Sequence, residues 1–172
     1  MPVSLSKILA ASRWGLLAIL AVAAFAVAVL PRATGYKWLW VHGPSVNVTL
    51  GLLKPDVPEE LESGGYVLMV WKGIDPNGVS KLQEGTIMVK KVGCLPGQYL
   101  KVTLVQADCD GVKVGHIRHE TMDGKPISPA LYDGIIPTGK VFLLGEHYYS
   151  YDSRYFGLVP VEWLRGSLQF TI

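Results

Sequence analysis

An uninterrupted apolar run near the N-terminus limits the folds open to this chain more than any other feature. Residues 14–30 (WGLLAILAVAAFAVAVL) carry no charged side chain. As a helix they would span about 26 Å at ~1.5 Å per residue, close to the shortest helix that crosses a bilayer. Pro31 predicts the end of that helix, because proline removes a backbone donor. Trp14, Trp38 and Trp40 suit the two membrane interfaces.

The same run also fits a secretory signal peptide that is removed after export. Lys7 and Arg13 precede it, and Ala26-Val27-Ala28 resembles a cleavage site. We favour an uncleaved anchor, because the run is long for the apolar core of a signal peptide. Residues 1–13 are then a short cytoplasmic N-terminus, 14–30 a transmembrane anchor and 31–172 an extracytoplasmic domain.

The residues after the run have the composition of a turn-rich β domain. The chain contains 19 Gly and 11 Pro, and no long helical periodicity follows residue 31. Residues 54–64 are polar and proline-punctuated, which predicts a surface loop. Apolar or alternating runs predict strands at 66–71 (buried on both faces), 86–92, 99–105, 140–144 and 161–172. We therefore expect a mostly β domain of short antiparallel strands behind one N-terminal transmembrane helix.

The chain has two cysteines, Cys94 and Cys109. After export they would lie in an oxidising compartment, where they could pair. Two buried free thiols are the alternative, and the sequence leaves both open. CxxC spacing is absent, so no zinc site is expected.

Three stretches follow the apolar run in the order typical of one peptidase family. They are 43–50 (GPSVNVTL), 90–98 (KKVGCLPGQ) and 145–160 (GEHYYSYDSRYFGLVP). The first holds a serine beside a proline, the second a lysine pair before a Pro-Gly turn, and the third the Asp-Ser-Arg-Tyr and Gly-x-Val-Pro patterns. Together they resemble signal peptidase I, a family of serine–lysine peptidases. The short chain and single anchor resemble its conjugative-transfer, TraF-like branch most.

The resemblance implies that Ser45 is a nucleophile and Lys90 its general base. A serine hydroxyl needs an adjacent base, and a lysine can be that base if burial lowers its pKa. Strand alternation sends Lys90 and Lys91 to opposite faces, so that one can face the site and the other water. The family pattern selects Lys90, with Lys91 as the alternative. The Ser45 backbone N–H would hold the oxyanion.

Asp152, Arg154 and Ser150 are expected to support this site. By resemblance, Asp152 and Arg154 form an ion pair that shapes the site, and Ser150 approaches the lysine ammonium. The alternative is a solvated surface pair with little energetic weight.

The chain departs from the family pattern at several positions. Gly43 stands where the general enzyme carries a side-chain oxyanion donor, and Asn47, Gln98 and Glu146-His147 replace Pro, Asp and Asp-Asn. These changes bear on substrate preference more than on reaction class.

The histidines offer competing sites. One of them with Ser45 and an aspartate would form a hydrolase triad, but no G-x-S-x-G surrounds Ser45. His116-x-x-His119 could hold a metal, but in a strand this spacing does not bring both imidazoles to one face. We expect surface positions for His116 and His119, and neither a metal nor a cofactor. The other two histidines are His42 and His147.

The expected substrate is an extended peptide that adds to a sheet edge beside the Lys90 strand. Candidate pocket walls, which core packing would explain equally well, are Val46, Val48, Leu50, Tyr66, Leu68 and Met88. The expected partner is an exported precursor, specifically a pilin-type subunit for conjugative transfer. General Sec precursors are one alternative, and a non-catalytic anchored binding module for a secretion partner is another.

The other expected partner is membrane lipid. Serine–lysine peptidases of this kind act on exported proteins. We therefore place the protein in the bacterial inner membrane, with its domain on the periplasmic side. The net charge of +2 without a Lys/Arg run gives no indication of nucleic-acid binding.

Overall fold

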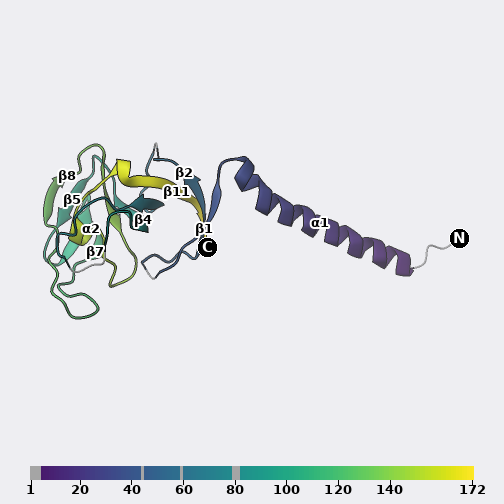
Figure 1. Cartoon of the computed structure of the whole chain (residues 1–172), viewed down its shortest axis with the longest axis horizontal. Coiled ribbons are helices and arrows are strands. Elements are labelled where there is room, and N and C mark those ends of the chain that lie inside the picture. Colours follow the sequence, from purple (N-terminus) through teal and green to yellow (C-terminus); the bar gives the residue numbers. More distant parts are fainter. Residues whose placement is uncertain (1–4, 44, 59, 79–81) are drawn as a thin grey trace. The chain divides into compact units, whose positions relative to one another are not determined.

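The computed structural model describes residues 5–43, 45–58, 60–78 and 82–172. For residues 5–13 and 30 it describes the backbone but not the side chains. The chain divides into two compact units between Lys37 and Trp38. The first is dominated by the helix α1 (Leu5–Ala33) (Figure 1).

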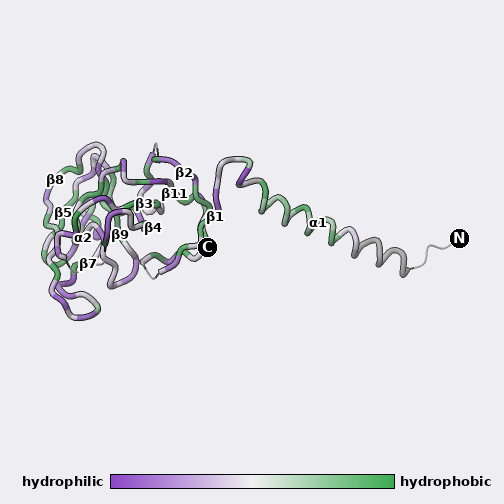
Figure 2. The backbone as a smooth tube through the Cα atoms, viewed as in Figure 1, coloured by the Kyte–Doolittle hydropathy of each residue, from purple (hydrophilic) through white to green (hydrophobic). Residues whose placement is uncertain are grey.

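α1 is long and apolar enough to cross a membrane over Trp14–Ala33, with a mean hydropathy of 2.4. Figure 2 shows most of this stretch as hydrophobic. The expectation that Pro31 ends the helix is wrong, since the helix continues to Ala33. The φ that proline fixes is compatible with a helix, and only two residues follow Pro31 before α1 ends. Beside it, Arg32 Nη1 donates a hydrogen bond to the Ala28 carbonyl (2.7 Å).

The second unit contains two sheets, whose described registers are all antiparallel. The strand order is β1-β2-β11-β3-β4-β9-β10 in the larger sheet and β7-β6-β5-β8 in the smaller. This confirms a mostly β domain with one N-terminal apolar helix. The strands are β1 (Lys37–Trp40), β2 (Leu50–Pro55), β3 (Tyr66–Val70), β4 (Ile87–Cys94), β5 (Tyr99–Val102), β6 (Gln106–Cys109), β7 (Val112–His116), β8 (Tyr132–Ile135), β9 (Lys140–Leu144), β10 (Val159–Pro160) and β11 (Leu164–Thr171).

Four expectations from the sequence need correction. The run 161–172 begins as a 3-10 helix, Val161–Trp163, and becomes a strand only at Leu164. β3 is buried on one face only, with Val67 and Met69 inside and its other residues half-buried. The run 99–105 stops at Val102, because the Thr103 hydroxyl accepts from the amides of residues 105 and 106 and closes a turn. The predicted loop 54–64 begins inside β2, which pairs with β11 as far as Pro55.

A disulfide joins the two sheets. Cys94 of β4 and Cys109 of β6 are bonded, with their Cα atoms 5.7 Å apart. Both are buried in a core cluster with Leu100 and Phe142. The structure therefore selects the disulfide over two free thiols.

Candidate active site

Lys90 is a buried lysine in the middle of the larger sheet. It lies on β4 and is 2% exposed. Its Nζ donates to Ser150 Oγ and to the Tyr151 carbonyl, both at 2.9 Å. Burial lowers the pKa of Lys90, while the negative charge of Asp152 partly opposes that shift and Arg154 adds to it. A lysine in this setting loses its proton more readily than one in water.

Lys91 points to the opposite face, as strand alternation predicts. Its Nζ lies 2.9 Å from Glu146 Oε1, and its side chain is 37% exposed. The hydrogen bond that Lys91 donates to Glu146 raises the pKa of Lys91, so this ammonium stays charged. The geometry therefore favours Lys90 over Lys91 as a base.

Ser45 is half-buried and approaches the loop that follows β9. Its carbonyl accepts a hydrogen bond from the Glu146 amide (2.7 Å). Gly145 separates Ser45 from Ser150: a Cβ there would collide with the Ser150 side chain and lie 2.8 Å from the Ser45 carbonyl oxygen. Ser45 thus lies in the neighbourhood of Lys90 through Gly145 and Ser150. Among the described hydrogen bonds, none joins Ser45 Oγ to Lys90 Nζ, and such bonds are often long before substrate binds.

Asp152 and Arg154 form a buried two-point ion pair. Arg154 Nε donates to Asp152 Oδ1 at 2.8 Å, and Arg154 Nη2 donates to Asp152 Oδ2 at 2.6 Å. Arg154 is 5% exposed and Asp152 is 0% exposed. The Gly145 amide also donates to Asp152 Oδ2 (2.8 Å). The solvated alternative is therefore wrong for this pair. Asp152 also caps the short helix α2 (Ser153–Phe156), where its side chain accepts from the Arg154 amide.

Arg118 is a positioning residue that the sequence reasoning missed. It is 8% exposed, and its guanidinium donates to the carbonyls of Tyr148 (3.0 Å), Tyr149 (3.0 Å) and Ser150 (3.2 Å). These bonds fix the backbone of the segment that presents Ser150 to Lys90. The pattern His-Ile-Arg-His around it contains no signal of this role.

Glu146 is a second residue whose role the sequence did not reveal. Its Oε2 accepts from the Asn47 amide (2.8 Å) and the Tyr66 hydroxyl (2.9 Å), while Oε1 binds Lys91. These bonds tie the Ser45 segment to β3 and β4. They favour the charged carboxylate and outweigh its partial burial, so the pKa of Glu146 is lowered.

A groove of about 300 Å³ runs from Ser45 over the first half of β4. Of the predicted walls, Val46, Leu68 and Met88 line it. Val48 is buried in a core cluster, and Leu50 and Tyr66 are not among the lining residues. The other lining residues are Leu39, Trp40, Val41, His42, Gly43, Ile87 and Val89.

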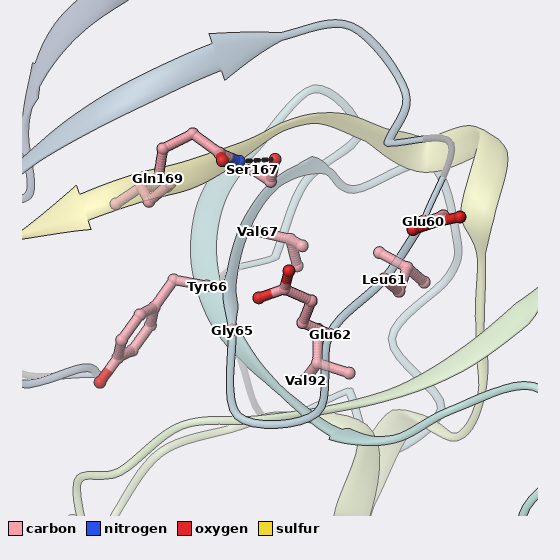
Figure 3. Close-up of a pocket in the computed structure, with 10 residues that line it drawn as sticks. Glu60, Leu61, Glu62, Gly65, Tyr66, Val67, Val92, Ser167 and Gln169 are labelled. Carbon is pink, nitrogen blue, oxygen red and sulfur yellow. Dashed lines mark hydrogen bonds between the residues drawn. The ribbon is translucent and has the colours of Figure 1, made fainter.

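Figure 3 shows a smaller pocket of about 100 Å³ elsewhere on β3 and β11. Glu60, Glu62 and Gln169 line it, but Ser45 and Lys90 do not. The Tyr66 side chain points away from the other drawn side chains. This pocket is not a candidate for the chemistry of Ser45.

Among the described hydrogen bonds, none joins a histidine side chain to Ser45 or Lys90. His116 Nε2 is 2.9 Å from Lys113 Nζ, and His119 Nε2 is 2.9 Å from the Leu104 carbonyl. His147 Nδ1 accepts from the Tyr149 amide, and His42 lines the groove. Among the described residues, no group of three or more His, Cys, Asp or Glu could hold a metal ion.

Comparison with known proteins adds a family. The sequence model of "Signal peptidase, peptidase S26" matches residues 12–172. The "Conjugal transfer protein TraF" of Agrobacterium tumefaciens (strain 15955) is 36% identical over 90 residues, 52% of this chain and 47% of that protein. The "Probable conjugal transfer protein TraF" of Sinorhizobium fredii (strain NGR234) is 34% identical over 98 residues, 56% and 48% of the two chains.

The chain thus spans about half the length of these curated relatives. A solved signal peptidase I from Enterococcus faecalis V583 is similar over 64% of this chain and 98% of its own, at 19% identity and a TM-score of 0.41.

Proposed function

Because the chain belongs to the signal peptidase family, peptidase S26, we propose that it is a membrane-bound serine endopeptidase with Ser45 as nucleophile and Lys90 as general base. The observation that carries this proposal is the setting of Lys90. Its Nζ is buried and donates to two uncharged oxygens instead of pairing directly with a carboxylate. This environment favours the neutral amine that a base requires.

Ser45 Oγ attacks the carbonyl carbon of the scissile peptide bond and passes its proton to the neutral Lys90 amine. The C–N bond then breaks, and Lys90 returns that proton to the leaving amine. A water next attacks the Ser45 ester, loses a proton to Lys90 and releases the acid, while Ser45 regains its hydrogen. Ser150 and Tyr151 accept from the ammonium at each stage where it forms.

The oxyanion is held by the Ser45 backbone N–H. Gly43 supplies no side-chain donor two residues earlier.

The groove beside β4 takes the acyl side of an extended peptide. Along Ile87–Val89, β4 pairs with β3 on one edge, whereas the described pairing with β9 on the other edge begins only at Lys91. A substrate strand can therefore add to the unpaired half of that edge, with apolar side chains over Leu68 and Val89.

The substrates are membrane-tethered exported precursors, specifically a pilin-type subunit of a conjugation system. The support is the family and the conjugal transfer proteins that the chain resembles. The anchor in α1 would hold the domain on the periplasmic face of the inner membrane, where such precursors emerge. Residues 1–13 would then be cytoplasmic and 31–172 extracytoplasmic.

The test is cleavage of a precursor by the full chain and single variants. Ser45→Ala and Lys90→Ala should each abolish processing while the protein still accumulates in the membrane. Lys91→Ala separates the two lysines: it should keep processing, at a reduced rate, because Glu146 loses one of the bonds that hold the Ser45 segment while Lys90 remains. Normal cleavage by the Lys90→Ala protein would defeat the proposal, and processing of several unrelated Sec precursors would favour a general peptidase.

A further inference from the structure

Lys90 Nζ has two acceptors, and different parts of the chain hold them. Nζ donates to Ser150 Oγ and to the Tyr151 carbonyl, both at 2.9 Å. The guanidinium of Arg118 holds the carbonyls of residues 148–150. Among the described hydrogen bonds, those that Arg118 makes to this segment stop at Ser150. The Tyr151 carbonyl needs another support if the Lys90 ammonium is to keep both acceptors.

That support comes from the loop between β3 and β4, through the Tyr151 side chain. The Tyr151 hydroxyl donates to Asp75 Oδ1 and accepts from Asn77 Nδ2 (3.1 Å). The Asn77 backbone amide donates to the same Asp75 oxygen (3.1 Å), which fixes the two loop residues relative to each other. The Tyr151 ring also stacks on the buried Tyr155, with ring centroids 5.6 Å apart and 9° between the ring planes. Hydroxyl and ring are both held, and the backbone of Tyr151 is held with them.

Asn77 joins this loop to two other segments of the domain. Its Oδ1 accepts from the Ser128 amide (2.8 Å), and its Nδ2 donates to the carbonyls of Ser128 (3.2 Å) and Tyr155 (3.3 Å). A carboxamide accepts at one atom and donates at the other, so it can meet both backbone groups of Ser128 and the Tyr151 hydroxyl at once. One half-buried side chain thereby reaches residues 51 and 74 positions further along the chain.

The Tyr151 hydroxyl keeps its proton at the pH where Lys90 is expected to act. Burial raises the pKa of Tyr151, its hydrogen bond to Asp75 raises that pKa further, and the bond from Asn77 opposes part of the shift. The phenol therefore stays neutral to a higher pH than a tyrosine in water. Burial lowers the pKa of Lys90, so this lysine loses its proton at a lower pH than a lysine in water. The hydroxyl can thus donate to Asp75 throughout the working range of the base.

We propose that Asn77 and Tyr151 are positioning residues, which hold the Tyr151 carbonyl against Lys90 Nζ while Arg118 holds Ser150. The proposal rests on the peptidase function proposed above and adds a requirement to it: the loop between β3 and β4 must bind the Tyr151 side chain for Lys90 to be aimed. A displacement of ~1 Å at a catalytic group can cost about 100-fold in rate, and the loss of one of two acceptors should cost part of that.

The experiment is steady-state cleavage of a precursor by the full chain in detergent, below the melting temperature of every variant. Tyr151→Phe removes the hydroxyl and keeps the ring on Tyr155. It should lower kcat roughly fivefold to tenfold and leave KM unchanged, because the groove that takes the peptide is intact. Tyr132→Phe is the matched control, since Tyr132 is also half-buried and its hydroxyl donates to the Ile135 carbonyl (2.8 Å) in the smaller sheet. This control should keep the wild-type kcat.

A second variant tests whether the two residues act through one contact. Asn77→Ala removes the carboxamide that faces the Tyr151 hydroxyl, so it should lower kcat at least as much as Tyr151→Phe. The double variant should lose about as much as the worse single variant, because both changes break the same contact. Losses that multiply in the double variant would contradict that shared contact. If the Asn77→Ala protein does not fold, Tyr151→Phe decides alone.

A wild-type kcat in Tyr151→Phe, or a change confined to KM, would overturn the proposal. A wild-type protein that cleaves no precursor would count against the peptidase function instead, and hydrogen exchange then tests the contact without turnover. The amides of residues 148–156 should exchange on the order of fivefold faster in Tyr151→Phe than in the wild type or Tyr132→Phe. Equal exchange in all three proteins would show that the loop does not hold this segment, and would refute the proposal.

Discussion

Replacing Asp152 by alanine removes the acidic half of the buried ion pair and leaves the Arg154 guanidinium uncompensated. Arg154 is 5% exposed, and loss of one partner from a buried pair typically costs about 3–5 kcal/mol. The change also removes the acceptor of the Gly145 amide and the cap of α2. For a domain of this size, we expect the melting temperature to fall by roughly 10–20 °C.

Activity should fall more than stability alone explains. The Gly145 amide lies between Ser45 and Ser150, and a displacement of ~1 Å at a catalytic group can cost about 100-fold in rate. Asp152→Glu should be milder in both respects. The assay is a precursor-cleavage time course below the variant's melting temperature, with thermal melts of the solubilised protein.

The matched control is Asp123→Ala. Asp123 also pairs with a basic residue two positions on, Lys125, but their side chains are 62% and 60% exposed. Such a surface pair contributes about 0–1 kcal/mol, so this variant should melt and cleave normally. If Asp152→Ala also melts normally and cleaves at the wild-type rate, the role of this pair in the site must be withdrawn.

Two further predictions concern residues other than Ser45 and Lys90. Arg118→Met should lower kcat about tenfold with little change in KM, because Ser150 loses its backbone support while the groove stays intact. Arg118→Lys should recover part of that rate in steady-state kinetics, and a change confined to KM would contradict the assignment. Cys94→Ser combined with Cys109→Ser should lower the free energy of unfolding by about 3 kcal/mol, given a loop of 15 residues. Equal denaturant midpoints for this variant and the oxidised wild type would contradict it.

The parts of the site that sequence could predict are those governed by local rules. Strand periodicity separated Lys90 from Lys91, and the structure buries the first and pairs the second with Glu146. The pairing of Asp152 with Arg154 followed from the family pattern, but its burial depends on the packing around α2.

Other features depend on contacts between distant segments. Arg118 reaches carbonyls about 30 positions away, and Glu146 meets the Asn47 amide 99 positions away. No spacing rule connects such residues before the sheets are assembled. The prediction for the end of α1 failed for a different reason: the φ that proline fixes is a helical one, and the helix continues for two residues past Pro31.

The pH dependence of kcat/KM tests the central claim, that a buried neutral Lys90 activates Ser45, most directly. Burial lowers the pKa of Lys90 from 10.5, and the base acts in its unprotonated form. The account therefore predicts that kcat/KM rises with pH and levels off at a pKa below 10.5, with no change on metal chelation. The Lys91→Ala variant should give the same profile. A kcat/KM that does not change with pH below 10.5 would contradict the account. A loss of activity on chelation that zinc restores would contradict it too.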